Sequence, residues 1–144
     1  MSFLGENKEQ MEAIVRQLGY EPDGNFLLAY NRMSTGAKVA VNIFLQQPWI
    51  GTGIAEKQHL IIFTPDKIVV HRLKKNGATT IYPASEITNF TVRDGANKST
   101  VFEFTHGTDK LSFYSYKDFS VRYKYVAENL AQLTANHFVG YAQA

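Results

Sequence analysis

The stretch that decides the fold reads His59-Leu60-Ile61-Ile62-Phe63-Thr64-Pro65-Asp66-Lys67-Ile68-Val69-Val70-His71. β-Branched side chains are dense in both halves of this stretch, which is typical of strands that are buried on two faces. In the middle, Pro65 sets the backbone angle that the second residue of a type I turn requires, and Asp66 suits the third position. The stretch therefore predicts a tight antiparallel hairpin and, with it, a β-barrel or β-sandwich.

Strand signals continue on both sides of this hairpin, with turn signals about every ten residues. The additional strands are predicted at 26–30, 39–45, 78–82, 86–93, 100–105 and 110–114. Asn76-Gly77 favours a type I′ turn, because both central residues of that turn need positive φ. Asp94-Gly95 repeats this signal, and residues 106–109 join the last two strands. The pattern predicts an all-β meander.

A short helix is predicted before the first strand. Its apolar residues recur at helical spacing, at Met11, Ile14, Val15 and Leu18. Asn7 is a suitable N-cap, and Gly19 is a typical C-terminal stop. Such a short helix is marginal alone, so we expect it to pack on the sheet or on a neighbouring molecule.

A longer helix is predicted at the C-terminal end, at about 116–138. Ser115 and Asp118 match a capping box. The apolar positions that follow at helical spacing are Phe119, Tyr123, Val126, Leu130 and Leu133. Burying these five side chains contributes on the order of 7 to 15 kcal/mol gross. We therefore expect this helix to cover the open end of the twisted meander.

The composition limits the possible classes of protein. A chain of 144 residues is the usual size of one domain. Its formal net charge of +2 gives no strong field for a polyanion, so nucleic acid is not expected as a partner. The sequence has no cysteine, no secretory signal pattern and no apolar run of about 18 residues, so we expect a cytoplasmic protein.

Two segments resemble the bacterial pleckstrin-homology-like (PH-like) domain family. The segment 60–70 is similar to the family's apolar strand, Thr/Asp/Lys turn and apolar strand, and 81–87 is similar to its strand and acidic-Ile step. The resemblance spans roughly Asn25 to Phe138. It implies a mainly β fold: a seven-stranded antiparallel barrel capped by a C-terminal helix, here with an additional short N-terminal helix. Residues 1–24 then form the N-terminal helix and linker, and 25–139 form the PH-like domain.

The resemblance alone does not define a function, because this superfold serves lipid, peptide and protein recognition. The sequence contains no catalytic, cofactor or metal-ligand motif, so we expect neither an enzyme nor a bound cofactor. The leading hypothesis is a non-catalytic interaction module that binds a protein segment or another copy of itself. Trp49 and Ile50, on a stretch interrupted by proline and glycine, are the candidate partner-binding residues.

Two alternatives remain open. Arg72, Lys74 and Lys75 form the one basic cluster of the sequence and are candidates for contact with anionic lipid. Three such charges provide roughly 3 kcal/mol near a membrane, so the second hypothesis is a weak peripheral membrane binder. The third hypothesis is a small-molecule-binding β-barrel whose aromatic residues line a cavity.

Overall fold

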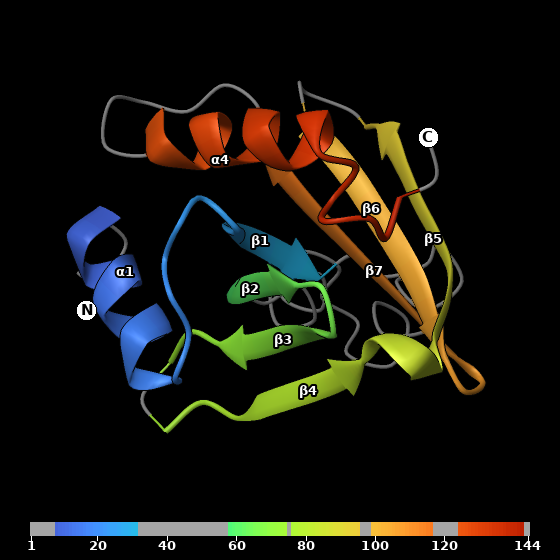
Figure 1. The fold of residues 1–144 in the computed structure, drawn as a ribbon, viewed down its shortest axis with the longest axis horizontal. Helices are drawn as coiled ribbons and strands as arrows, with labels where there is room; N and C mark the ends of the chain where they lie inside the picture. Colours follow the sequence, from blue (N-terminus) through green and yellow to red (C-terminus); the bar gives the residue numbers. More distant parts are fainter. Residues whose placement is uncertain (1–7, 32–57, 75, 96–98, 117–123, 143–144) are drawn as a thin grey trace, which may run out of the picture.

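A computed structural model describes residues 8–31, 58–74, 76–95, 99–116 and 124–142. They form one seven-stranded antiparallel sheet, one helix before it and one helix after it, so the fold is mainly β as predicted (Figure 1). The helices are α1 (Lys8–Gln17) and α4 (Lys124–Ala135), and η2 (Ala84–Glu86) is a single 3₁₀ turn. The strands are β1 (Phe26–Asn31), β2 (Gln58–Thr64), β3 (Lys67–Arg72), β4 (Thr79–Pro83), β5 (Ile87–Asp94), β6 (Ser99–His106) and β7 (Asp109–Tyr116).

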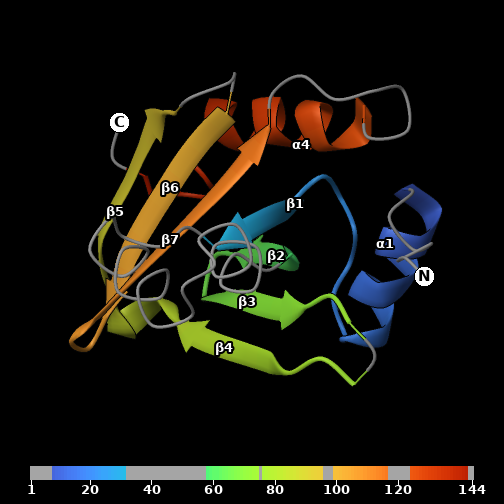
Figure 2. The ribbon, with the colours of Figure 1, turned by 180° about the vertical axis from the view of Figure 1, so that it is seen from behind.

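The sheet is open rather than closed. Its order is β4-β3-β2-β1-β7-β6-β5, so that β4 and β5 are the two edges and do not pair. The predicted closure into a barrel is therefore not confirmed. β1 pairs with β2 from Phe26 to Tyr30 but reaches β7 only through Tyr30 and Asn31. Because the contact at β1 is so short, β5–β7 cross β1–β4 steeply (Figures 1 and 2). The strand predicted at 39–45 lies outside the described residues.

The β2–β3 and β6–β7 hairpins turn where the sequence predicts, whereas the turn predicted at Asp94-Gly95 continues into residues 96–98, which lie outside the described residues. In the β2–β3 hairpin Thr64 pairs with Lys67, which confirms the predicted tight hairpin. Thr64 Oγ1 donates to Asp66 Oδ1 at 2.8 Å and accepts from the Lys67 N–H at 3.1 Å. Between β6 and β7, Gly107 has a φ of +64°. Between β3 and β4 the predicted type I′ turn is wrong, because Asn76 has a φ of 58° but Gly77 has no positive φ. Gly77 instead permits a close approach to the carbonyl group of residue 72.

Helix α1 begins and ends close to the predicted positions. Met11 and Val15 are fully buried in the core, and Ile14 and Leu18 pack against it. Gly19 has a φ of +95°, and its N–H donates to the Arg16 carbonyl at 2.9 Å. The N–H of the next residue donates to the Val15 carbonyl at 3.1 Å, which completes a Schellman motif. Gly19 therefore ends this helix as predicted; Asn7 lies outside the described residues.

Helix α4 covers one end of the sheet, but its start was predicted wrongly. Ser115 and Tyr116 still belong to β7. Ser115 is buried, and its hydroxyl donates to the Leu28 carbonyl of β1 at 3.0 Å rather than capping a helix. Further along, Asn129 Nδ2 donates to the Phe26 carbonyl at 3.1 Å, which fixes α4 to β1. Phe119 and Tyr123 lie outside the described residues.

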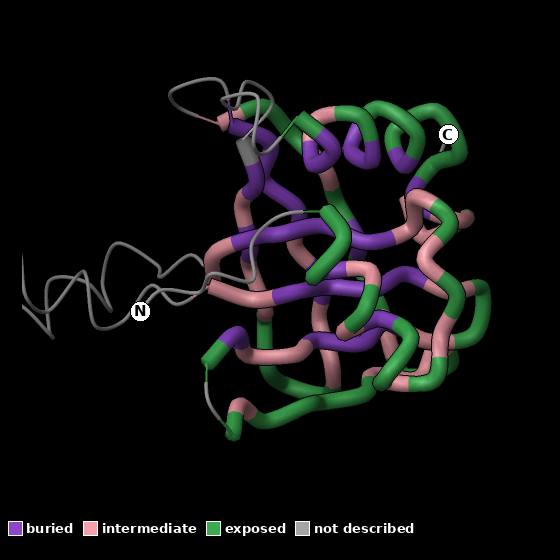
Figure 3. Tube along the Cα trace, turned by 90° about the vertical axis from the view of Figure 1, so that its left-hand side faces the viewer, coloured by how far each residue is buried: buried purple, intermediate pink, exposed green. Residues whose placement is uncertain are grey.

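The apolar side of α4 faces the sheet as predicted. Val126, Leu130 and Leu133 are buried in the same core as the strands. Figure 3 shows the buried stretches of this upper helix in purple on its lower side, toward the buried central strands. The helix ends at Ala135 rather than near 138. The covering of the sheet end therefore comes from α4 together with the segment that follows it.

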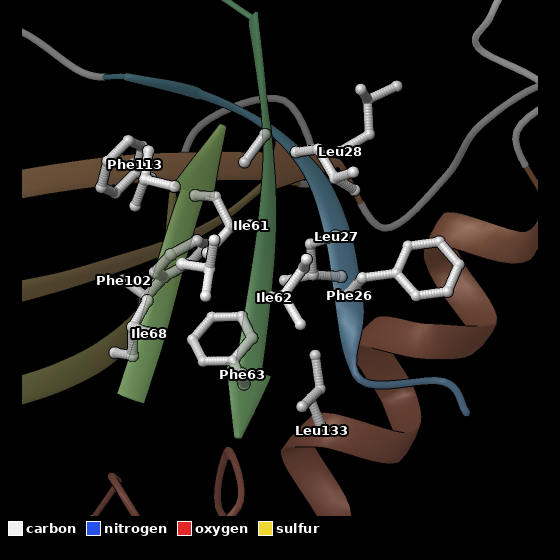
Figure 4. Packing of buried hydrophobic residues seen from close by; sticks show 14 of the residues in the cluster. Phe26, Leu27, Leu28, Ile61, Ile62, Phe63, Ile68, Phe102, Phe113 and Leu133 are labelled. Atoms are coloured by element: carbon white, nitrogen blue, oxygen red, sulfur yellow. The ribbon is translucent and has the colours of Figure 1, made fainter. Parts of the chain in front are cut away.

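Phenylalanine rings fill the inner face of the bent sheet, which is the face enclosed between β1–β4 and β5–β7. The ring centroid of Phe63 lies 5.7 Å from that of Phe102 (Figure 4). The ring centroid of Phe90 lies 6.3 Å from that of Phe63. Phe138, which follows α4, closes this cluster at 5.3 Å from Phe63. Strands β2, β5 and β6 thus share one aromatic core with the C-terminal segment.

The segment after α4 has an unusual backbone. His137, Phe138 and Val139 have φ values of 57°, 52° and 56°, and Gly140 follows at 95°. Residues other than glycine rarely adopt this left-handed conformation, so tertiary contacts must hold it. Phe138 is 1% exposed, and Tyr141 Oη donates to the Thr64 carbonyl at 2.8 Å. Burial and the Asp66 charge raise the pKa of Tyr141 to about 12, so this donor keeps its proton at neutral pH.

This backbone predicts opposite effects for two glycine substitutions. His137 is exposed and occupies the position at which a left-handed residue ends α4. We expect His137→Gly to raise the free energy of unfolding by about 1 kcal/mol, because glycine adopts this φ without the Cβ clash. Glu128→Gly, at an exposed position inside α4, should lower it by about 1 kcal/mol. Urea unfolding checks both, and a loss of stability in both variants would contradict the left-handed end.

Candidate functional site

The inner face of the sheet is filled at one end and open at the other. The open end is a pocket of about 390 Å³, which we call the mouth pocket. Side chains of five strands line it, from β1, β2, β3, β4 and β7, together with the loop between β3 and β4. Phe113 forms its apolar floor next to the Phe102 ring, at a centroid distance of 5.6 Å. The mouth pocket therefore begins where the aromatic core ends.

Positive charge gathers at one end of the mouth pocket. Arg72 ends β3 and Lys74 follows in the loop, and both line the pocket. No acidic side chain in the described part of the chain forms an ion pair with either of them. His59 lies directly opposite Arg72 in the β2–β3 register, and its ring contacts Phe113 edge-on at 5.7 Å. The structure thus brings together two of the three predicted basic residues; Lys75 lies outside the described residues.

The other end of the mouth pocket has acidic neighbours. Tyr82 lines this end, and its ring packs 5.0 Å from the His106 ring. His106 Nε2 lies 2.8 Å from Glu86 Oε1. Burial, followed by the charge of Asp109, raises the pKa of Tyr82. The charged groups near the mouth pocket are therefore basic at the Arg72 end of β4 and acidic at the Tyr82 end.

The edge strand β4 directs half of its main-chain groups away from the sheet. The Arg72 N–H donates to the Ala78 carbonyl at 2.9 Å, so these two residues form a hydrogen-bonded pair. In an antiparallel ladder such pairs alternate along the strand. Thr79 and Ile81 therefore direct their N–H and C=O groups outward, where no described strand pairs with them. We call these outward groups the free edge of β4.

Two further observations agree with this orientation. At the far end of β4 the Ala84 N–H donates to the Asp66 carbonyl at 2.9 Å, which gives the ladder the same phase. Pro83 lies at an outward position of β4, so its missing N–H costs no hydrogen bond with β3.

The side chain of Ile81 is 51% exposed and is the one exposed large hydrophobic side chain found among the described residues. The free edge is thus accessible and partly apolar.

The opposite edge of the sheet is shaped differently. The β5–β6 register shifts between Thr88 and Thr91, and Asn89 within this bulge has a φ of 55°. Arg93, which also lies on β5, forms an ion pair with Glu103 at 3.4 Å. Bulges and charges are the features by which natural sheets prevent pairing at an edge. By contrast, β4 has neither a bulge nor a charged residue.

Arg72 and Lys74 were named as candidate residues from the sequence, but Ile81 was not. The available signal was the stretch 76–85, which contains no charged residue and includes the β-branched run Thr79-Thr80-Ile81. Trp49 and Ile50, the predicted partner-binding residues, lie outside the described residues. Within the described ranges no group of three His, Cys, Asp or Glu side chains is placed to hold a metal ion.

Comparisons with known proteins give no further guide to this site: no family model matches the chain, and no match was found among curated proteins. No helix in the described part of the chain has the length and apolar character that crossing a membrane requires.

His71 provides a pH test beside the free edge. Its Nδ1 lies 2.7 Å from Thr79 Oγ1, and burial lowers its pKa from the ordinary value of 6.5. The folded state therefore favours neutral His71, and this stabilisation is lost as the pH falls from the unfolded pKa toward the folded one. We expect the free energy of unfolding to fall less in His71→Gln than in the wild type between about pH 7.5 and about pH 5. Urea unfolding at both pH values checks this; equal pH dependence would contradict the lowered pKa.

Proposed function

We propose that this chain is a non-catalytic interaction module that binds an extended segment of a partner protein as an additional strand on the free edge of β4. The observation that carries the proposal is the outward direction of the main-chain groups of Thr79 and Ile81. Such groups form hydrogen bonds with an added strand in strand-addition complexes. Exposed Ile81 offers an apolar contact for a side chain of that strand.

The contrast between the two sheet edges supports this choice of surface. An unprotected free edge carries a risk of aggregation, and natural proteins usually blunt it. The bulge of β5 and the charge of Arg93 blunt one edge, whereas β4 is limited only by its short length and by Pro83. A binding role gives a reason for the absence of a bulge and of charged residues from β4.

We further propose that the domain is PH-like. The strand order β4-β3-β2-β1-β7-β6-β5 and the position of α4 over one sheet end support this assignment. The assignment is compatible with peptide recognition, although the fold by itself does not specify a ligand. The Phe rings that fill the inner face favour an interaction module over a small-molecule-binding barrel.

Peptide selection tests the proposed edge. A phage-displayed library of random linear peptides is selected on the wild-type protein, and the selected peptides are titrated against variants. We expect Ile81→Lys and Ile81→Pro to weaken binding by about tenfold or more, because one places a charge on the edge and the other removes an outward N–H. Thr91→Lys, at an exposed position on β5, should leave binding unchanged.

Amide hydrogen exchange supplies the geometric readout. Binding of a selected peptide should slow exchange at Thr79 and Ile81, whose N–H groups would then be bonded to the peptide. Unchanged exchange, or peptides that bind the Ile81 variants as tightly as the wild type, would refute strand addition. A dimer in light scattering that Ile81→Lys abolishes would assign the free edge to a second copy of the chain instead.

Anionic lipid is a second candidate ligand, favoured by the position of Arg72 and Lys74 in the mouth pocket. Two basic residues provide about 2 kcal/mol near an anionic membrane, so binding by one copy should be weak. We expect sedimentation with vesicles only when phosphatidylserine is added to phosphatidylcholine, with less binding at high salt and after combined Arg72→Gln and Lys74→Gln substitution. Equal sedimentation with pure phosphatidylcholine would exclude this function.

A further inference from the structure

We infer that the segment bound at the free edge of β4 carries an acidic side chain beside Ala78 or Thr80 and an apolar side chain beside Ile81. The inference rests on the proposed function and specifies the chemistry of the partner. It combines the phase of the β3–β4 ladder with the position of Arg72 and Lys74 in the mouth pocket, where no described acidic side chain pairs with them.

The pleat of the sheet decides which way each side chain of an added strand points. Side chains alternate between the two faces of a sheet, and an added strand continues the alternation of its neighbour. Thr80 points to the inner face and lines the mouth pocket, whereas Ile81 pairs with Val69 on the outer face. A partner residue beside Thr80 therefore faces the mouth pocket, and the adjacent residue faces the exposed Ile81.

Arg72 and Lys74 define what the inward side chain should be. Arg72 pairs directly with Ala78, and both residues line the mouth pocket. Adjacent strands are about 4.8 Å apart, so an added strand lies about 9.6 Å from the Arg72 backbone. An arginine and a glutamate side chain together span this distance. A carboxylate there would neutralise charges that no described acidic group pairs with.

The Tyr82 end of β4 disfavours an acidic residue in the partner strand. Tyr82 faces the pocket there, close to Asp109 and to the Glu86–His106 pair. A carboxylate beside Tyr82 would approach these acidic groups and be repelled. The preferred partner is therefore acidic at one inward position only, rather than acidic throughout.

A second copy of β4 lacks this chemistry. Its residues are Thr79, Thr80, Ile81, Tyr82 and Pro83, none of which is charged. Pairing two copies through β4 would therefore bring no acidic side chain of that strand to Arg72 and Lys74. Charge complementarity thus favours a different protein, whose segment carries one inward acidic side chain next to outward β-branched side chains.

Synthetic peptides test the inference separately from the proposed function. The probe is fluorescein-labelled Gly-Ser-Val-Thr-Val-Glu-Val-Ser-Gly, with two counterparts in which Gln or Lys replaces Glu, titrated by fluorescence anisotropy. We expect the Glu peptide to bind the wild type about tenfold more tightly than the Gln peptide, and the Lys peptide to bind most weakly. Combined Arg72→Gln and Lys74→Gln substitution should abolish this preference, and added salt should reduce it. Combined Lys8→Gln and Lys124→Gln substitution, on α1 and α4 outside the mouth pocket, is the control that removes the same number of positive charges.

The outcomes separate the two proposals. Equal binding of the Glu and Gln peptides, with both still weakened by Ile81→Lys, would overturn the acidic preference and leave strand addition intact. Peptides that bind independently of Ile81 would overturn strand addition itself. The inference would also be overturned if the Arg72 and Lys74 double variant still bound the Glu peptide more tightly than the Gln peptide. It would likewise be overturned if the double substitution weakened binding to phosphatidylserine vesicles but left peptide binding unchanged.

Discussion

The packing of Phe63 is the constraint on which the rest of the structure depends. This ring on β2 contacts Phe90 on β5, Phe102 on β6 and Phe138 after α4. A flat sheet would keep β2 far from β5 and β6, because β1 and β7 lie between them in the sheet order. The contacts form only if the sheet folds over on itself at β1, where pairing with β7 involves just two residues of β1. The aromatic core therefore imposes the steep crossing of the two halves of the sheet.

The same core explains the left-handed segment after α4. Three non-glycine residues with positive φ cost on the order of 3 to 6 kcal/mol. Burial of a phenylalanine such as Phe138 contributes about 3 to 5 kcal/mol, as judged from replacing such residues by alanine. The two amounts are similar, so the turn also needs its hydrogen bonds, from Tyr141 Oη to the Thr64 carbonyl and from Val139 N–H to Asn136 Oδ1. The backbone is thus held by packing and bonding together.

Features that depend on neighbouring residues could be predicted from the sequence, whereas features that depend on contacts between distant residues could not. The β2–β3 hairpin and the end of α1 at Gly19 depend on residues close in sequence, and both were predicted. Ser115 resembled a helix cap, but its hydroxyl bonds Leu28, which is 87 residues away. Arg72 and Lys74 were recognised from their charge alone. The exposure of Ile81 could not be inferred in the same way, because it follows from the place of β4 at the end of the strand order.

The open sheet, which corrects the predicted barrel, is also what creates the candidate binding surface. A closed barrel would pair β4 with β5 and leave neither edge available. Here the Ala84 N–H bonds the Asp66 carbonyl, and η2 then leads the chain into β5, which belongs to the crossing half of the sheet. The two edge strands therefore follow each other in sequence but diverge in space. Because the Phe cluster fills only the capped end of the inner face, the free edge of β4 borders the open mouth pocket. Successive side chains of a partner strand added there would point alternately to the outer face of the sheet and to the basic mouth pocket.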